Sequence, residues 1–183
     1  MVVDKDQAVR GDTTLEQLKD LKPAYKPDGV ITAGISSPLN AAATSMILMS
    51  KESAKKKGIR PLATIRSIGF AGVDPTIMGA GPIPASKKAL ASAGLQVKDI
   101  DYWEINEAFA IVPLYCIKEL GIDPDRVNVM GGGLAIGHPL GATGVRLVGT
   151  LARILEKKGG RYGLANACVG GGQGVATIIE REA

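Results

Sequence analysis

Helical and strand patterns alternate along most of this chain of 183 residues. Apolar and small residues recur at helical spacing over residues 83–93, 107–120 and 141–158. Short apolar runs typical of strands lie before, between and after these segments, at residues 61–68, 100–105, 127–130, 162–167 and 175–180. Alternation of this kind predicts an α/β fold in which helices cover a sheet in layers.

Two further helices are expected nearer the amino-terminal end. Residues 39–57 alternate small and apolar groups at helical spacing and stop at Gly58, a usual helix terminator. Near residues 13–21, Thr13 can cap a short helix, with Glu16 at the capping-box position. Because the surrounding stretch is polar, we expect this short helix to belong to an excursion outside the core.

The composition argues against several kinds of protein. The chain has 45% hydrophobic residues, no apolar run of about 18 residues and no basic-then-apolar start, so we expect a globular cytoplasmic protein without a membrane span. Its net charge of +4 comes from short lysine clusters, and 4% aromatic residues leave few side chains to stack on bases, which disfavours nucleic acid. The two cysteines, Cys116 and Cys168, lack CxxC spacing, so we expect neither a disulfide framework nor a metal.

Three short segments have the residue types that chemistry requires. Residues 106–110 lie at a strand-to-helix junction, residues 137–144 open a helix, and residues 168–174 join two strands. All three fall at the ends of expected elements, where α/β folds place their sites. Their glycine runs alone do not separate phosphate binding from tight turns, and neither run matches the known phosphate-binding motifs in context.

His138 is the only histidine of the chain. Pro139 biases it away from the α region, so its ring can project past the start of the helix and donate to a carbonyl oxygen. The thiol of Cys168, beside glycine N–H groups, can exchange protons. Neither residue alone identifies a catalytic site, because a lone histidine is commonly structural and a free cysteine is commonly a small buried apolar residue. Cys116, in the middle of an expected helix, is interpreted as core.

Together the three segments resemble the carboxyl-terminal half of the thiolase family. Residues 106–109 match its Asn-Glu-Ala-Phe motif, residues 131–144 its Gly-His-Pro segment, and residues 168–174 its Cys-x-Gly-Gly-Gly-x-Gly motif. Residues 32–40 resemble the coenzyme A segment, with Pro38 and Ala41 where the family usually has glycine and aspartate, and residues 72–82 resemble a further signature. The similarity extends over essentially the whole chain.

The resemblance implies a division into three parts. Residues 1–36 would be the end of the coenzyme A-binding loop domain, and residues 37–76 the last helix and strand of the amino-terminal domain. Residues 77–183 would form the layered α-β-α carboxyl-terminal domain.

The resemblance also implies roles for single residues. Cys168 would move the proton to and from the α-carbon or the thiol, and His138 would donate into an oxyanion hole beside a water held by Asn106. Gly170 would offer its N–H to the oxyanion on an acylated cysteine. The positions that match family contacts to coenzyme A are Arg10, Ala33, Ser37, Ala108 and Phe109.

A thiolase of usual length carries its nucleophilic cysteine in an amino-terminal domain, and nothing here corresponds to it beyond a helix and a strand. Because Met1 falls in the middle of the expected loop domain, our first expectation is a subunit of a split thiolase of fatty acid metabolism. A partner chain with the nucleophilic cysteine would complete it as a heterotetramer acting on acyl-CoA, with no permanently bound cofactor. The alternatives are a fragment of a normal-length enzyme and a non-catalytic acyl-CoA-binding or scaffold subunit.

Overall fold

The computed structural model describes residues 2, 4–6 and 8–182, and its centre is one four-stranded sheet. Met1, on which the expectation of a separately made subunit rests, lies outside the described residues. The strands stand in the order β1-β4-β3-β2, with β4 antiparallel to both its neighbours and β2 parallel to β3. Their bounds are β1 Ala63–Gly72, β2 Tyr102–Ile105, β3 Tyr162–Val169 and β4 Gln173–Arg181.

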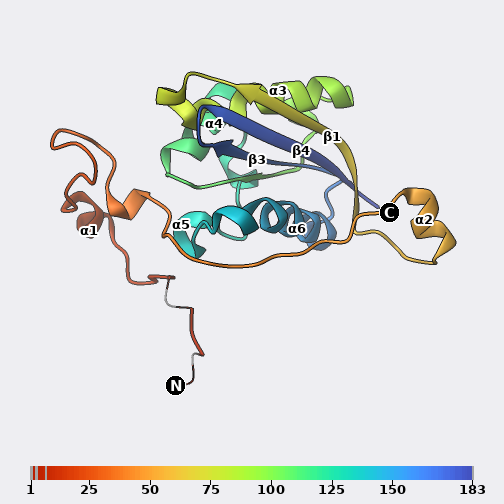
Figure 1. Ribbon diagram of the computed structural model, residues 1–183, viewed down its shortest axis with the longest axis horizontal. Coiled ribbons are helices and arrows are strands. Elements are labelled where there is room, and N and C mark those ends of the chain that lie inside the picture. Colours follow the sequence, from red (N-terminus) through yellow and green to blue (C-terminus); the bar gives the residue numbers. More distant parts are fainter. Residues whose placement is uncertain (1, 3, 7, 183) are drawn as a thin grey trace.

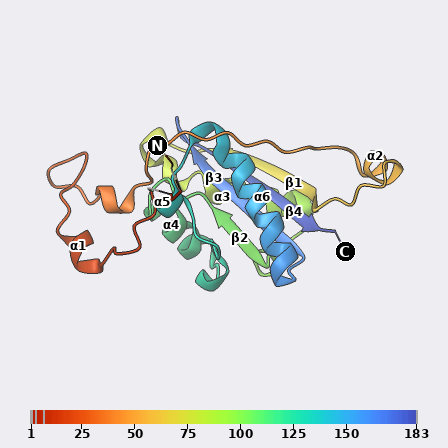
Figure 2. The ribbon, with the colours of Figure 1, turned by 90° about the horizontal axis from the view of Figure 1, so that it is seen from below.

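Helices cover both faces of the sheet, as Figures 1 and 2 show. One face carries α3 (Pro82–Ala93) and α4 (Ile111–Leu120), and the other carries the short α5 (Gly133–Ile136) and the long α6 (Leu140–Lys158). The expected layered α/β fold is therefore confirmed. Outside the layers lie α1 (Leu15–Lys19) and α2 (Lys51–Lys56). The described residues also form 3₁₀ turns at Ala33–Ile35, Pro75–Ala80, Val97–Asp99 and Pro124–Arg126.

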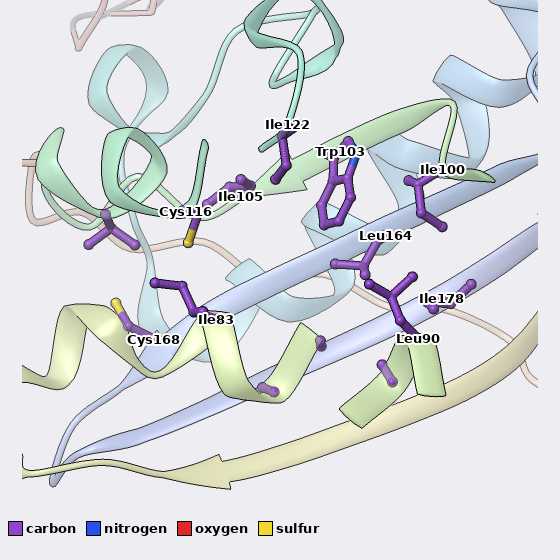
Figure 3. Packing of buried hydrophobic residues seen from close by; sticks show 14 of the residues in the cluster. Ile83, Leu90, Ile100, Trp103, Ile105, Cys116, Ile122, Leu164, Cys168 and Ile178 are labelled. Atoms are coloured by element: carbon purple, nitrogen blue, oxygen red, sulfur yellow. The ribbon is translucent and has the colours of Figure 1, made fainter. Parts of the chain in front are cut away.

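The larger core lies between the sheet and the α3–α4 layer (Figure 3). Trp103 and Ile105 on β2 and Leu164 on β3 point into it and are at most 1% exposed, because alternate residues of a strand face the same side. Each such side chain contributes about 1.5–3 kcal/mol by leaving water. Helix α3 approaches β1 closely at Gly69, where a Cβ atom would lie 2.3 Å from the Ala85 carbonyl oxygen.

The second core lies under α6. Leu147, Leu151 and Leu155 recur every four residues on one side of this helix and pack on Ala165 and Ile179 of the sheet. This spacing explains why the helical pattern of residues 141–158 predicted α6 to within one residue at its start. A left-handed Gly159 ends the helix, as glycine commonly does.

The prediction of a helix over residues 39–57 is wrong for most of this range, because only Lys51–Lys56 (α2) forms a helix. The coil before α2 runs along the loop that precedes α6: Pro38 O accepts from His138 N (3.2 Å), Asn40 Nδ2 donates to Ile136 O (2.9 Å) and Thr44 Oγ1 donates to Ala142 O (2.9 Å). Its apolar side chains have little to pack on, with Leu39 94% and Ile47 85% exposed. A helix of this length depends on burying its apolar side, so the local pattern is not sufficient.

The strand expected at residues 127–130 is also wrong. Val127 makes a single parallel bridge to Trp103, and the next residue, Asn128, takes a positive φ of 48°. The Asn128 side chain then replaces a strand, because Oδ1 accepts from Ile105 N (2.8 Å) and Nδ2 donates to Ile105 O (2.9 Å). An asparagine tolerates this backbone conformation better than most residues and has both a donor and an acceptor.

The strand expected as the last of a separate amino-terminal domain joins the main sheet instead. Although expected at residues 61–68, β1 extends to Gly72, where its last pair is Gln173 of β4. Pairing with β4 satisfies the backbone groups of β1 on the side that faces β4. Because β1 pairs with β4, the sheet includes strands from both sides of the boundary expected at residue 76.

Two helix starts also differ from expectation. The cap of α1 is Thr14, which forms the capping box with Gln17, because the Thr13 hydroxyl donates instead to Arg10 O (3.0 Å). Helix α4 begins at Ile111 and not at residue 107.

In the part of the chain that the structure describes, no helix has the length and apolarity needed to cross a membrane.

Candidate functional site

Parallel pairing of β2 and β3 brings two of the expected site residues to one edge of the sheet. Asn106 directly follows β2, and its N–H donates to Asn166 O of β3 (2.9 Å). Cys168 lies two residues farther along β3. The carboxyl ends of parallel strands are where α/β sheets place their sites, and this edge is such a place.

His138 lies in the short link between α5 and α6, where the helix cannot begin before Pro139. Its ring is held from both sides: Nε2 is 3.2 Å from Nδ2 of Asn106, and Nδ1 is 2.7 Å from Oγ1 of Thr143. The Thr143 hydroxyl donates its one proton to Pro139 O (2.9 Å), so it accepts from the histidine. His138 therefore carries its proton on Nδ1 and presents the Nε2 lone pair to Asn106.

The charge of His138 follows from its surroundings. Burial lowers the pKa of the imidazole, and the positive charge of Arg146 lowers it further. The ring is accordingly neutral at neutral pH. In this state Nε2 is an acceptor, and it becomes a donor to an oxyanion only when the ring is protonated or changes tautomer.

Cys168 is a buried thiol at the end of β3. Burial raises its pKa, so it holds its proton at neutral pH. Cys116 lies on α4 on the same side of the sheet (Figure 3). It is 0% exposed, and burial together with Cys168 raises its pKa to about 12, in agreement with its interpretation as core. Among the described residues, no hydrogen bond joins Cys168 to His138.

The glycines that follow Cys168 form the turn between β3 and β4. Gly171 and Gly172 have φ values of 84° and 81°, which other residues rarely adopt. At Gly172 a Cβ atom would also lie 2.3 Å from Val73 O, so the turn packs directly on another backbone segment. Gly170 lies in this turn, exposed, two residues beyond Cys168.

Three of the five positions expected to contact coenzyme A lie together. Ser37 N and Ser37 Oγ both donate to Ala108 O, at 3.0 and 3.1 Å. Phe109 makes an edge-to-face contact with Tyr25, with 6.4 Å between ring centroids. The amino-terminal excursion is thus tied to the loop after β2, which explains why α4 starts later than the pattern predicts. Ala33, in a 3₁₀ turn, and Arg10 are exposed.

Several residues around the site were not singled out from the sequence. Glu107 accepts from Leu134 N (3.0 Å) and from Asn128 Nδ2 (2.6 Å), so it ties the start of α5 to the loop after β2. Gly132 leaves room for this carboxylate, because a Cβ atom there would lie 2.4 Å from it. The Asn-Glu-Ala-Phe motif could have indicated Glu107. No local pattern marks Thr143 as the partner of the histidine ring.

An open groove of about 690 Å³ runs beside α6. Its lining includes Met46 of the coil, Met130 and, on α6, Arg146 and Arg153. Arg146 connects this groove with the surroundings of His138. In the described part of the chain, no three histidine, cysteine or carboxylate side chains gather as a metal site would require.

The fold and the site define an α/β domain with a histidine, an asparagine and a cysteine at the carboxyl edge of parallel strands. Residues 59–181 match the family model described as the C-terminal domain of thiolase, and residues 1–52 match that of its N-terminal domain. The chain belongs to the thiolase family.

Similar proteins agree with this assignment. A 3-ketoacyl-CoA thiolase of Marinobacter nauticus is 50% identical over 98% of this chain and 47% of its own length, and one of Salmonella typhimurium is 48% identical over 96% and 46%. The crystal structure of human mitochondrial 3-ketoacyl-CoA thiolase in complex with CoA has a TM-score of 0.89 at 44% identity, covering 97% of this chain and 45% of that one. The crystal structure of the Bacillus anthracis acetyl-CoA acetyltransferase has a TM-score of 0.92 at 48% identity, covering 97% of this chain and 45% of that one. The chain spans about half the length of these relatives.

Proposed function

We propose that this chain is the half of an acyl-CoA thiolase that supplies the oxyanion-hole histidine and the acid/base cysteine. The observation that carries the proposal is the Asn106–His138 contact at the sheet edge where Cys168 also lies. A nucleophilic cysteine would come from a partner chain that corresponds to the rest of the family's amino-terminal domain. The names of the similar proteins support 3-ketoacyl-CoA as the substrate class.

The protonated state of Cys168 fits an order of events for thiolysis. The partner's cysteine thiolate attacks the 3-keto carbon, and the bond between the α-carbon and that carbon breaks. The electron pair passes to the enolate of the departing acyl-CoA, which takes the proton of Cys168 at its α-carbon. The Cys168 thiolate then takes the proton of an incoming coenzyme A thiol, whose sulfur accepts the acyl group and releases the partner's cysteine.

Two groups would stabilise the oxyanions. His138, once it presents an Nε2 proton, would donate to the enolate oxygen together with a water held by Asn106. The Gly170 N–H would serve the oxyanion on the acylated cysteine. In both cases the donors would act on charge that develops only during the reaction, which is what accelerates it.

The coenzyme A part of the substrate would lie along the amino-terminal excursion. Ser37, Ala108 and Phe109 would line the pantetheine and acyl end, with Ala33 beside them and Arg10 near the nucleotide end. The hydrogen bonds of Ser37 to Ala108 support a common surface for the first three. We further propose a cytoplasmic heterotetramer in fatty acid metabolism that needs no permanently bound cofactor or metal.

The proposal is tested by thiolysis assays with a 3-ketoacyl-CoA. We expect no turnover by the chain alone and turnover when the remaining amino-terminal part of a thiolase is co-expressed with it. Cys168→Ala and His138→Ala should each reduce the rate of the assembled enzyme by roughly 10²–10⁴-fold. Cys116→Ala is the control, and it should cost little because that thiol is buried in the core.

The alternatives give different results. A fragment of a normal-length enzyme would regain activity only when joined to its own missing half in one polypeptide. A non-catalytic acyl-CoA-binding subunit would retain acyl-CoA binding and lose nothing on Cys168→Ala. Robust turnover by the chain alone would contradict the partner proposal, because one of its own two cysteines would then have to act as nucleophile.

A further inference from the structure

A charged pair is buried between β2 and α6. Glu104 is 0% exposed, and the Arg146 side chain is 15% exposed. Arg146 Nη1 lies 3.9 Å from Glu104 Oε2, close enough for attraction between the charges but too far for a hydrogen bond. In the described part of the chain, both carboxylate oxygens and Arg146 Nε and Nη2 are buried without a hydrogen-bond partner.

The pair stands directly beside His138. Glu104 and Asn106 are two residues apart in an extended segment, so both face the α6 side of the sheet. Thr143 and Arg146 are three residues apart on α6, so they share one side of the helix. The Glu104–Arg146 contact between β2 and α6 therefore lies next to the contacts by which Asn106 and Thr143 hold the histidine ring.

A contribution to stability does not account for this pair. A buried ion pair generally contributes no more to stability than apolar side chains of the same size, because both charges must leave water. Here the geometry leaves four polar atoms unsatisfied, which makes the pair costlier still. Because this pair costs stability and lies next to a reactive group, we expect it to have a role that apolar residues could not fill.

The charged groups around the pair are few. Arg146 approaches from α6 and Glu107 from the loop after β2, while the residues of β3 that pack under α6 are Ala165 and Ala167. Burial raises the pKa of Glu104 to about 7, against the attraction of Arg146, and the charge of Glu107 adds to the rise. Burial lowers the pKa of His138, and Arg146 lowers it further.

We propose that Glu104 and Arg146 form a positioning pair that sets the charge of His138. Arg146 adds to the effect of burial in keeping the ring neutral, and Glu104 opposes Arg146 only when its own carboxyl is ionised. Below neutral pH Glu104 is protonated, Arg146 acts unopposed, and His138 stays neutral to a lower pH. The inference rests on the proposed function for the catalytic role of His138, but it concerns a property of the chain that can be measured without turnover.

The test is an NMR titration of the full chain, in which the single histidine is observed without overlap from others. The ring signals of His138 should show two inflections: its own, below the ordinary histidine range, and a second near pH 7 that reports Glu104. Glu104→Gln should abolish the upper inflection and keep the lower one. Arg146→Met should raise the pKa of His138, and Arg146→Lys, which keeps the charge, should restore the low value.

The exposed pair Arg153–Glu156 on the same helix provides matched controls, because its atoms are 2.8 Å apart but its side chains are 55% and 51% exposed. Arg153→Met and Glu156→Gln should leave both inflections in place. If Arg146→Met does not fold, the double variant Glu104→Gln/Arg146→Met removes both charges of the pair and should raise the pKa of His138 equally. An unchanged His138 titration in Arg146→Met or in the double variant would overturn the inference. Absence of thiolase activity with a partner would refute the proposed function and leave this titration unaffected.

Discussion

At the scale of single residues, the hydroxyl of Thr143 decides which nitrogen of His138 carries the proton. Its proton is donated to Pro139 O at 2.9 Å, so the oxygen can only accept from the ring at 2.7 Å. The position of Thr143 on the first turn of α6 makes this bond possible, because the helix begins immediately after His138 and Pro139. Rotation of the ring is prevented on its other side by Asn106.

Thr143→Val should release the ring from this tautomer. The variant leaves Nδ1–H without its partner, so we expect the free energy of unfolding to fall by about 1–3 kcal/mol and the Nε2–H tautomer to gain population. Long-range ¹H–¹⁵N NMR of the one histidine measures the tautomer. Thr143→Ser keeps the hydroxyl and should behave as the unaltered chain. An unchanged tautomer in the valine variant would mean that Asn106 alone determines it.

Among the elements, β2 is completed at its end by a side chain, that of Asn128, in place of a neighbouring strand. Its amide makes both hydrogen bonds to Ile105 that a neighbouring strand would supply, and Nδ2 also contacts Glu107 at 2.6 Å. The backbone then turns away toward α5 and the histidine link. One residue therefore ends the β2 edge of the sheet and directs the chain to the site.

Asn128→Ala should destabilise the fold by about 2–4 kcal/mol, because it leaves the Ile105 backbone groups unpaired and places alanine at a positive φ. Asn128→Gly removes the same bonds but suits the φ of 48°, so it should be about 1 kcal/mol less harmful. Urea unfolding of the two variants separates the hydrogen bonds from the backbone conformation. A loss below about 0.5 kcal/mol in both would contradict the role assigned to the side chain.

At the scale of the whole molecule, part of the sheet is left without cover. Ser67, Gly69 and Ala71 of β1 face α3, so Ile68 and Phe70 point to the opposite side, where α6 packs on β2, β3 and β4. Ile68 is 48% and Phe70 67% exposed. β1 is also an edge strand, and an apolar edge is a surface on which chains pair.

We therefore expect the chain alone to self-associate and the co-expressed pair to be well defined. Phe70→Asp should reduce self-association of the chain alone and should weaken assembly with the partner, as measured by size-exclusion chromatography with light scattering. Leu15→Asp is the matched control, because Leu15 is 70% exposed but belongs to the isolated α1. If the unaltered chain alone is a well-folded monomer, its edge is protected and the argument for a covering partner fails.

Features that depend on near neighbours along the chain could be predicted from the order of the residues. The 3.6-residue period predicted α3 and α6, left-handed glycines ended both helices, and Pro139 placed His138 ahead of α6. The motifs around Asn106, His138 and Cys168 determined the family, which the comparisons confirm.

Features that depend on partners far along the chain could be established only from the three-dimensional fold. In the folded chain β1 pairs with β4, and the Asn128 side chain makes the hydrogen bonds expected of a strand. The segment before α2 forms a coil in place of the expected helix. The fold also places Glu104 opposite Arg146, 42 residues away, next to the histidine. The physical reason is that a turn or a cap is stabilised by atoms a few residues away, whereas strand pairing and the pKa of a buried group depend on which distant residues exclude water from them.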